Sequence, residues 1–172
     1  MVNTQIDCSG AQPVIMSATL DDAAELLAVQ KAAFHQEAVF YNNFTIAPLA
    51  ETLEEYVGAF NRYTVLKAVA DGKIVGSVRA HSENGTCCIT RLVVHPGWQR
   101  HGIGSRLMRG IEDCFHSAVD RFELFTGGKS SGNIAFYINN GYRIFKRSET
   151  TEVPMAFMEK CIRHRTSVPE EP

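Results

Sequence analysis

The sequence predicts an α/β (α+β) fold in which about four helices pack on a mixed sheet of about seven strands. Two turn dipeptides, Asp71-Gly72 and Asn84-Gly85, separate strand-like segments in the middle of the chain, as is typical of β-hairpins. Helical apolar patterns lie on both sides of these segments, so strands and helices alternate. A length of 172 residues favours one domain with its own core.

The first third of the chain predicts a short strand and two helices. Residues 14–16 are an apolar strand, and Thr19 is expected to cap a helix that runs to about residue 37. A loop is expected over residues 41–48. One helix follows, and its apolar stripe comprises Leu49, Leu53, Tyr56, Val57 and Phe60.

The middle of the chain predicts three antiparallel strands and then a helix. The strands cover residues 63–70, 73–81 and 86–95, and Pro96-Gly97 ends the third. The helix after them carries an apolar stripe at a spacing of four residues, made of Ile103, Leu107, Ile111 and Phe115.

The last part of the chain predicts a strand, a short helix and two final strands. The strand over residues 121–126 follows a crossover helix and is therefore expected to run parallel to its neighbour. Ser130 or Ser131 is expected to cap a helix that ends before Asn140-Gly141. The final strands cover residues 142–146 and 155–162. The fold is thus expected over about residues 13–162, with loose ends on a single domain of residues 1–172.

Composition excludes several classes of protein. A net charge of −2 gives no basic field for nucleic acid, and no apolar run approaches the length of a membrane span. The five cysteines are odd in number and lack metal-ligand spacing, which indicates reduced thiols and no metal. The N-terminus lacks the pattern of a signal peptide. The sequence therefore favours a cytoplasmic protein without nucleic-acid or membrane partners.

The segment Gln99-Arg100-His101-Gly102-Ile103-Gly104 joins a strand to an amphipathic helix. Glycines let the backbone approach a ligand, and a helix N-terminus offers unpaired N–H groups, so this segment predicts a phosphate site. A dinucleotide fingerprint needs a third glycine, where Leu107 stands, and a parallel βαβ unit. The Walker A pattern is absent.

The longer run from Val94 to Gly104 resembles the acetyl-CoA signature of the GCN5-related N-acetyltransferases, V-x-P-x-x-[QR]-x-x-G-x-[GA], at every specified position. A second segment, residues 133–142, loosely resembles the family's N-x-x-A-x-x-F/L-Y-x-x-x-G-F/Y pattern. The resemblance covers about residues 13–162. It implies a single-domain, mostly antiparallel fold and transfer of an acetyl group from acetyl-CoA to an amine, without a metal.

The resemblance also implies where acetyl-CoA binds. Backbone N–H groups from Gln99 to Ser105 would hold the pyrophosphate, with Arg100, His101 or Arg106 adding positive charge. Pantetheine would pair with the splayed fourth strand through Leu92 and Val94, and an amide near Val93 would polarise the thioester carbonyl. The expected coenzyme contacts are Leu92, Val93, Val94, Gln99, Arg100, His101, Gly102, Ile103, Gly104, Ser105, Asn133 and Phe136. The glycines alternatively serve helix packing, Asn133 alternatively starts its helix, and the arginines alternatively face solvent.

Acyl transfer needs a base for the amine and an acid for the departing thiolate. Tyr137 matches the family's position for the acid, although a tyrosine in the core is the alternative. Where many members carry a glutamate, two residues before Leu92, this chain has Thr90, which cannot act as a base. The base therefore stays open among His81, Glu83, His35, Glu37 and water, and His95 and His116 are expected to be structural.

The acceptor is expected to bind between residues 35–48 and the final hairpin, residues 147–154. Aromatic side chains Phe40, Tyr41 and Phe44 lie in the first segment, and Glu149 and Glu152 in the second. The acceptor is a small-molecule or peptide amine, and a homodimer is possible in such a family. A non-catalytic CoA-binding regulatory module is the main alternative, because the strand carboxylate is missing, and a nucleotide-binding module is a weaker one.

Overall fold

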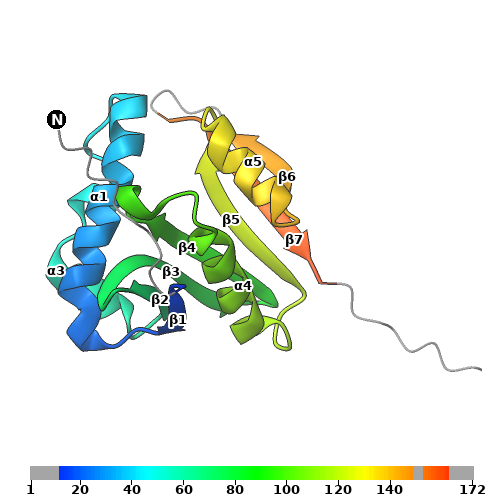
Figure 1. Cartoon of the computed structure of the whole chain (residues 1–172). Helices are drawn as coiled ribbons and strands as arrows, with labels where there is room; N and C mark the ends of the chain where they lie inside the picture. Colours follow the sequence, from blue (N-terminus) through cyan, green and yellow to red (C-terminus); the bar gives the residue numbers. More distant parts are fainter. Residues whose placement is uncertain (1–11, 149–152, 163–172) are drawn as a thin grey trace, which may run out of the picture. The chain divides into compact units, whose positions relative to one another are not determined.

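The computed structural model describes residues 12–148 and 153–162 of the chain. Within these residues, seven strands form a sheet in the order β1-β2-β3-β4-β5-β7-β6 (Figure 1). Strands β4 and β5 pair in parallel, whereas β1 with β2, β5 with β7 and β6 with β7 pair antiparallel. The predicted mixed, mostly antiparallel sheet is confirmed.

The chain divides into two compact units, and the first contains residues up to 79 together with residues 91–111. Its turns of 3₁₀ helix are η1 (Leu20–Asp22) and η2 (Pro96–Trp98). Its larger elements are β1 (Val14–Ser17), α1 (Ala23–Tyr41), α2 (Ala47–Ala50), α3 (Leu53–Ala59), β2 (Thr64–Ala70), most of β3 (Lys73–Glu83), the end of β4 (Thr86–Val94) and most of α4 (Ile103–Phe115).

The second unit contains residues 80–90 and those from 112 onwards. Besides the remaining parts of β3, β4 and α4, it holds β5 (Arg121–Gly127), α5 (Ser131–Asn139), β6 (Arg143–Ser148) and β7 (Met155–Cys161). Strand β7 pairs with β5 on one edge and with β6 on the other, with an irregular register in β6 between Ile144 and Lys146. Buried side chains of β5 and β7, such as Phe122, Leu124 and Met158, form its core.

The turn residues adopt the backbone angles that the sequence predicts. Asp71 and Gly72 have φ of 51° and 72°, and Asn84 and Gly85 have φ of 48° and 74°. Two successive positive φ angles match the right-handed twist of the flanking strands, which explains why Asp-Gly and Asn-Gly stand here. The parallel pairing of Thr86–Cys88 with Arg121–Glu123 likewise confirms the predicted crossover.

The helical region after β1 differs from the prediction in two ways. Helix α1 continues to Tyr41, so the predicted loop begins later, at Asn42 with a φ of 49°. The single helix predicted from Leu49 is instead α2 and α3, because Glu51 leaves helical geometry and Thr52 caps α3. As a result Leu53 and Val57, expected on the apolar stripe, are exposed.

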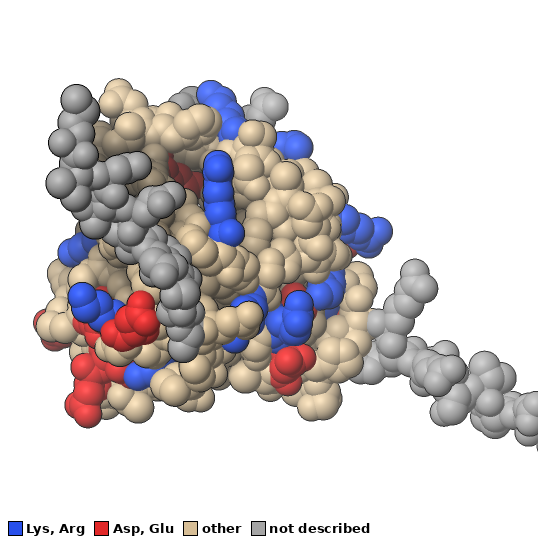
Figure 2. Space-filling model, in the orientation of Figure 1, with Lys and Arg blue, Asp and Glu red and all other residues tan. Residues whose placement is uncertain are grey.

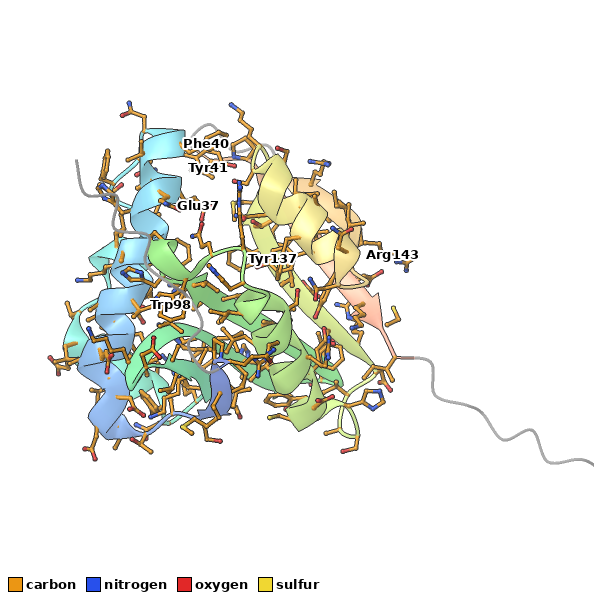
Figure 3. All side chains as sticks on the ribbon, in the orientation of Figure 1. Glu37, Phe40, Tyr41, Trp98, Tyr137 and Arg143 are labelled. Atoms are coloured by element: carbon orange, nitrogen blue, oxygen red, sulfur yellow. The ribbon has the colours of Figure 1, made fainter. Side chains whose placement is uncertain are left out.

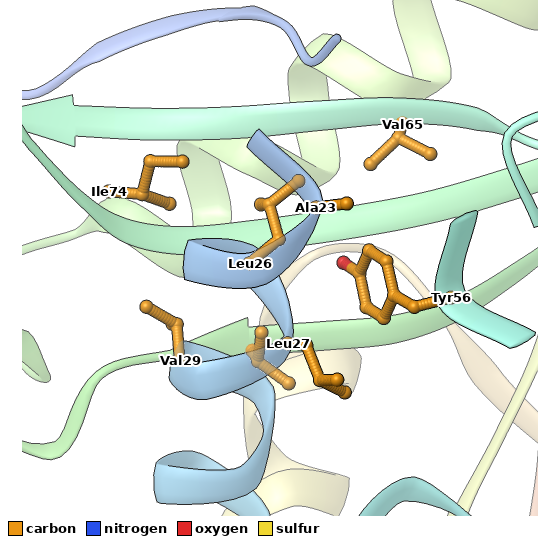
Figure 4. Close-up of a cluster of buried hydrophobic side chains, with 8 residues drawn as sticks. Ala23, Leu26, Leu27, Val29, Tyr56, Val65 and Ile74 are labelled. Atoms are coloured by element: carbon orange, nitrogen blue, oxygen red, sulfur yellow. The ribbon is translucent and has the colours of Figure 1, made fainter. Parts of the chain in front are cut away.

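The core of the first unit is formed by α1, α3 and the strands beneath them (Figure 4). Leu26 and Val29 of α1 lie in one cluster with Tyr56 of α3 and with Val65 and Ile74 of the sheet. Full burial of a large apolar side chain stabilises a fold by about 1.5–3 kcal/mol for each residue. The cluster therefore fixes α1 on the sheet.

Candidate functional site

The end of β4 carries a backbone irregularity at Arg91, which has a φ of 52°. A non-glycine residue in this conformation costs about 1–2 kcal/mol, so the strand is locally strained at this residue. The parallel register with β5 covers Thr86–Cys88, so Leu92–Val94 lie outside it. Val93 packs into the core, whereas Leu92 and Val94 are half-buried.

The loop after β4 turns sharply into α4. His95 accepts a hydrogen bond at its ring Nδ1 from the Gly97 N–H over 3.2 Å. The backbone N–H of His95 donates to Val75 O over 2.8 Å. This confirms a structural role for His95. Arg100 and Gly102 then have φ of 66° and 73°, which bends the chain into the helix.

The first turn of α4 presents unpaired amides. The Arg106 N–H donates to Gly102 O over 3.1 Å, which is the first bond of the helix ladder. The amides of Ile103, Gly104 and Ser105 precede this bond and have no acceptor within the helix. A Cβ on Gly102 would meet nothing within 4 Å, so space is open beside the turn, and glycine is required there by its φ of +73°.

Gln99 ties this loop to its surroundings. Its amide nitrogen donates to Gln36 Oε1 of α1 over 3.2 Å and to Val94 O over 3.3 Å. The backbone carbonyl of Gln99 contacts His101 Nδ1 at 2.8 Å. The end of β4, the loop of residues 95–102 and the C-terminal half of α1 are thereby connected through one side chain.

A buried charged network lies between α1, the α2–α3 junction and β3. Arg79, which is 3% exposed, donates to both oxygens of Glu51 over 3.0 and 2.8 Å and to Gln30 Oε1 over 2.7 Å. Gln30 in turn donates to Glu51 Oε2 over 2.6 Å and to Pro48 O over 2.9 Å. Burial opposes ionisation of Glu51, but the bonds from Arg79 and Gln30 prevail and lower its pKa.

This network escaped the sequence analysis. Its members are separated by up to 49 residues, so no local motif contains them. The available signal was Arg79, a charge inside the apolar strand of residues 74–80, because a charge at such a position needs a buried partner. That signal does not reveal the partner's identity.

The last turns of α1 carry Glu37, Phe40 and Tyr41 (Figure 3). Phe40 and Tyr41 form an edge-to-face pair with ring centroids 5.0 Å apart. The ring centroids of His35 and Phe44 are 5.7 Å apart. Glu37 is half-buried, and burial raises its pKa. Within the described residues its carboxylate has no hydrogen bond or ion pair. Of the predicted acceptor residues, Glu149 and Glu152 lie outside the described residues.

The remaining groups considered as bases or as structural residues differ from Glu37 in their surroundings. Thr90, which cannot act as a base, is half-buried in β4. His81 is half-buried near the end of β3, and Glu83 is exposed beside the hairpin turn. His116 is exposed after α4.

The second unit carries Tyr137 on α5 (Figure 3). Its ring is half-buried and makes edge contacts with Phe136 and Tyr142, with centroids 5.2 and 6.1 Å apart. Asn133 is exposed in the first turn of α5. The helix begins after Ser130 and ends before Gly141, with a φ of 91°, as predicted.

Tyr142 follows that glycine and is anchored in the core. Its hydroxyl donates to Glu112 Oε1 over 2.8 Å, and Lys160 Nζ donates to Glu112 Oε2 over 2.6 Å. Burial, followed by the nearby Glu112 carboxylate, strongly raises the pKa of Tyr142, so this phenol stays protonated. The tyrosine therefore has a structural role.

A sequence model described as the acetyltransferase (GNAT) family matches residues 27–142. The chain belongs to the GNAT acetyltransferase family. The matched segment contains both the loop before α4 and the whole of α5, and the resemblance seen in the sequence is confirmed.

Solved structures share the GNAT fold with this chain. The ribosomal-protein-S18-alanine N-acetyltransferase of Escherichia coli has a TM-score of 0.74 at 16% identity, with 90% of this chain and 97% of that chain covered. The PaiA N-acetyltransferase of Thermoplasma acidophilum, solved with coenzyme A, has a TM-score of 0.68 at 17% identity, covering 88% and 100% of the two chains. At these identities the likeness establishes the fold.

A curated relative of the GNAT chain is the UPF0157 protein YqkA of Bacillus subtilis (strain 168), which is 26% identical over 136 residues. The match covers 79% of this chain and 38% of that protein, so the chain spans well under half of its relative. Activity and substrates of the whole protein are therefore matters for proposal.

Several structural features bear on the predicted absence of metal and membrane sites. Among residues 12–148 and 153–162, no cluster of three or more His, Cys, Asp or Glu is placed to hold a metal ion. No helix in the same ranges is long and apolar enough to cross a membrane. Basic and acidic side chains are interspersed on the face drawn in Figure 2.

The cysteines of the described part are unpaired. Cys87 and Cys88 project to opposite faces of β4, so Cys87 is buried and Cys88 is half-buried, whereas Cys114 and Cys161 are exposed. Burial raises the pKa of the Cys87 thiol to about 12. Cys8 lies outside the described residues.

Proposed function

We propose that this protein is an acetyl-CoA-dependent N-acetyltransferase in which an amine attacks the thioester directly. The observation that carries the proposal is the start of α4, where unpaired amides of residues 103–105 lie beside an open space at Gly102. Such amides and the helix dipole favour a pyrophosphate. Arg100, which is exposed, and the half-exposed Arg106 would add positive charge.

The end of β4 fits the pantetheine arm. The backbone of Leu92–Val94 lies outside the β5 register, as pairing with an added extended ligand requires. Val94 O accepts a long bond of 3.3 Å from the Gln99 side chain, which a pantetheine amide would replace. The amide near Val93 and Val94 would polarise the thioester carbonyl. Asn133 and Phe136 remain proposed coenzyme contacts from α5.

Our mechanism assigns one proton transfer to each of two side chains. The carboxylate of Glu37 would take a proton from the acceptor ammonium, directly or through water, because its raised pKa suits a base better than an ordinary carboxyl. The new C–N bond forms as the C–S bond breaks. Tyr137 would donate its phenolic proton to the departing CoA thiolate, and the second proton that the nitrogen loses as the amide forms would return to the Tyr137 phenolate through water.

Replacement of Gly104 tests the coenzyme site. We expect Gly104→Val to weaken acetyl-CoA binding at least tenfold, about 1.4 kcal/mol, because a branched side chain would push the phosphates from the amides. Titration calorimetry measures the affinity. Gly58→Val is the matched control, since Gly58 lies in another helix and a Cβ there meets nothing within 4 Å.

Two results would contradict parts of the proposal. Unchanged affinity in Gly104→Val would refute the loop assignment. Saturable binding without release of CoA thiol for any amine would instead favour a non-catalytic CoA-binding module, the alternative that the absence of a carboxylate at Thr90 supports.

A further inference from the structure

The charged network of the first unit contains more positive than negative charge. Arg79, Arg91 and Glu51 lie together, with Arg91 Nε 3.7 Å from Glu51 Oε2. Two guanidinium groups thus share one carboxylate. Their side chains are only 4% and 21% exposed and that of Glu51 13%, so water screens the extra charge poorly.

The Glu51 carboxylate is already occupied by other donors. Its Oε1 accepts from Arg79, and its Oε2 accepts from Arg79 and from Gln30. A separation of 3.7 Å is too long for a hydrogen bond from Arg91. Arg91 Nε is buried without a hydrogen-bond partner. Within the described residues, the Arg91 guanidinium therefore shares with Arg79 the one carboxylate in ion-pair range, and the cluster keeps an excess positive charge.

The position of Arg91 connects this unmatched charge with the reaction. Arg91 has a positive φ inside β4, directly between Thr90 and the Leu92 backbone proposed to hold pantetheine. A strained backbone at such a position is a reason to look for a function. The acceptor amine must reach the thioester. A second group on the acceptor, a few bonds away from the amine, would then lie close to the Arg91 guanidinium.

We propose that the acceptor amine also carries a carboxylate, and that Arg91 binds this carboxylate. A guanidinium presents paired N–H donors that match the two oxygens of a carboxylate, which gives both affinity and orientation. The inference rests on the proposed N-acetyltransferase function and names its substrate class. Arg91 is then a specificity residue, and Glu51 with Arg79 holds it in place.

The test compares acids with their neutral amides as acceptors. Free amino acids, their α-carboxamides, and C-terminally amidated dipeptides with an acidic side chain are supplied with acetyl-CoA, and thiol release and acetylated product are measured. We expect kcat/KM to be at least tenfold higher for an acid than for its amide in the wild type. The amidated acidic dipeptides distinguish a side-chain carboxylate of a peptide from the carboxylate of a free amino acid.

Variants of Arg91 show whether this preference depends on its charge. Arg91→Gln is expected to raise the acceptor KM at least tenfold for acids and to remove the preference, and Arg91→Lys to keep part of it. Arg62→Gln is the matched control, because Arg62 is an exposed arginine that contacts Tyr63. Circular dichroism and acetyl-CoA binding verify that each variant folds.

The outcomes separate the two proposals. Transfer to amides or to uncharged amines at rates equal to those of acids would overturn the substrate class and leave the enzyme intact. A preference for acids that persists in Arg91→Gln would overturn the role of Arg91. Acetyl-CoA binding without transfer to any carboxylate-bearing amine would also contradict the inference, whereas loss of acetyl-CoA binding itself would refute the proposed function.

Discussion

Glu37 shows how one side chain can be prepared for chemistry by its surroundings. It lies on the helix that also carries Gln36, whose amide oxygen accepts from Gln99 of the loop before α4. Burial without a cationic partner raises its pKa, in contrast to Glu51, whose pKa Arg79 and Gln30 lower despite burial. Two glutamates of one unit thus acquire opposite properties from their neighbours.

Replacement of Glu37 by glutamine should lower activity and raise stability. The folded protein holds the Glu37 proton more tightly than the unfolded chain, so the charged carboxylate opposes folding above its raised pKa. Glu37→Gln removes that charge, and we expect a higher midpoint of thermal unfolding at pH 7. Turnover should fall at least tenfold, and its decline on the acidic side of the pH profile should disappear.

Glu25→Gln provides the comparison for this experiment, because Glu25 is an exposed glutamate on the same helix whose carboxylate accepts from the Ile74 N–H. The Glu25→Gln variant should keep the acidic limb of the wild-type profile, that is, the decline of turnover at low pH. If Glu37→Gln leaves the limb in place, water or another group is the base. The base could not be chosen from the sequence, since the unpartnered burial of Glu37 depends on tertiary structure.

At the scale of elements, the turn into α4 was predictable and the α2–α3 region was not. The loop depends on local backbone chemistry, such as the glycine at position 102 and the turn before a helix, and local chemistry is visible in a sequence. The break at Glu51 depends on a carboxylate reaching Arg79, 28 residues away. An apolar pattern alone continues through that break.

Thr52 is the residue that starts α3 after the break. Its hydroxyl accepts from the Glu55 N–H over 3.2 Å, and its own N–H donates to Glu55 Oε2 over 2.8 Å, which is a complete capping box. We expect Thr52→Ala to lower the free energy of unfolding by about 1 kcal/mol, measured by urea denaturation. Thr52→Ser retains the hydroxyl and should recover most of the loss. Equal losses in both variants would show that the cap contributes little.

At the scale of the whole molecule, the pairing of neighbouring strands from β2 to β5 follows from local signals. Two hairpin turns fix the antiparallel strands in the middle of the chain, and the crossover through α4 fixes the parallel pairing of β4 with β5. Long-range polar contacts have no such signal, which is why Arg79, Glu51 and Gln30 were missed. A single N-acetyltransferase domain, its acceptor and its oligomeric state stay predictions.

The same long-range network should make the protein acid-sensitive. The bonds from Arg79 and Gln30 hold the pKa of Glu51 below its usual 4.5, so its stabilising effect is present above that pH and is lost as pH falls through the lowered value. We expect Glu51→Gln to lower the free energy of unfolding by about 3–5 kcal/mol at pH 7, because it leaves buried guanidinium groups without an anion.

Denaturant titrations of the wild type and Glu51→Gln across the acidic pH range measure this effect. The difference between the two proteins should be largest near neutral pH and should shrink as the wild-type carboxylate is protonated. Glu54→Gln, which alters an exposed glutamate in the first turn of α3, should change stability by no more than about 0.5 kcal/mol. A difference between wild type and Glu51→Gln that stays constant down to pH 3 would show that hydrogen bonding or shape at this position, and not its charge, holds α1, α2 and β3 together.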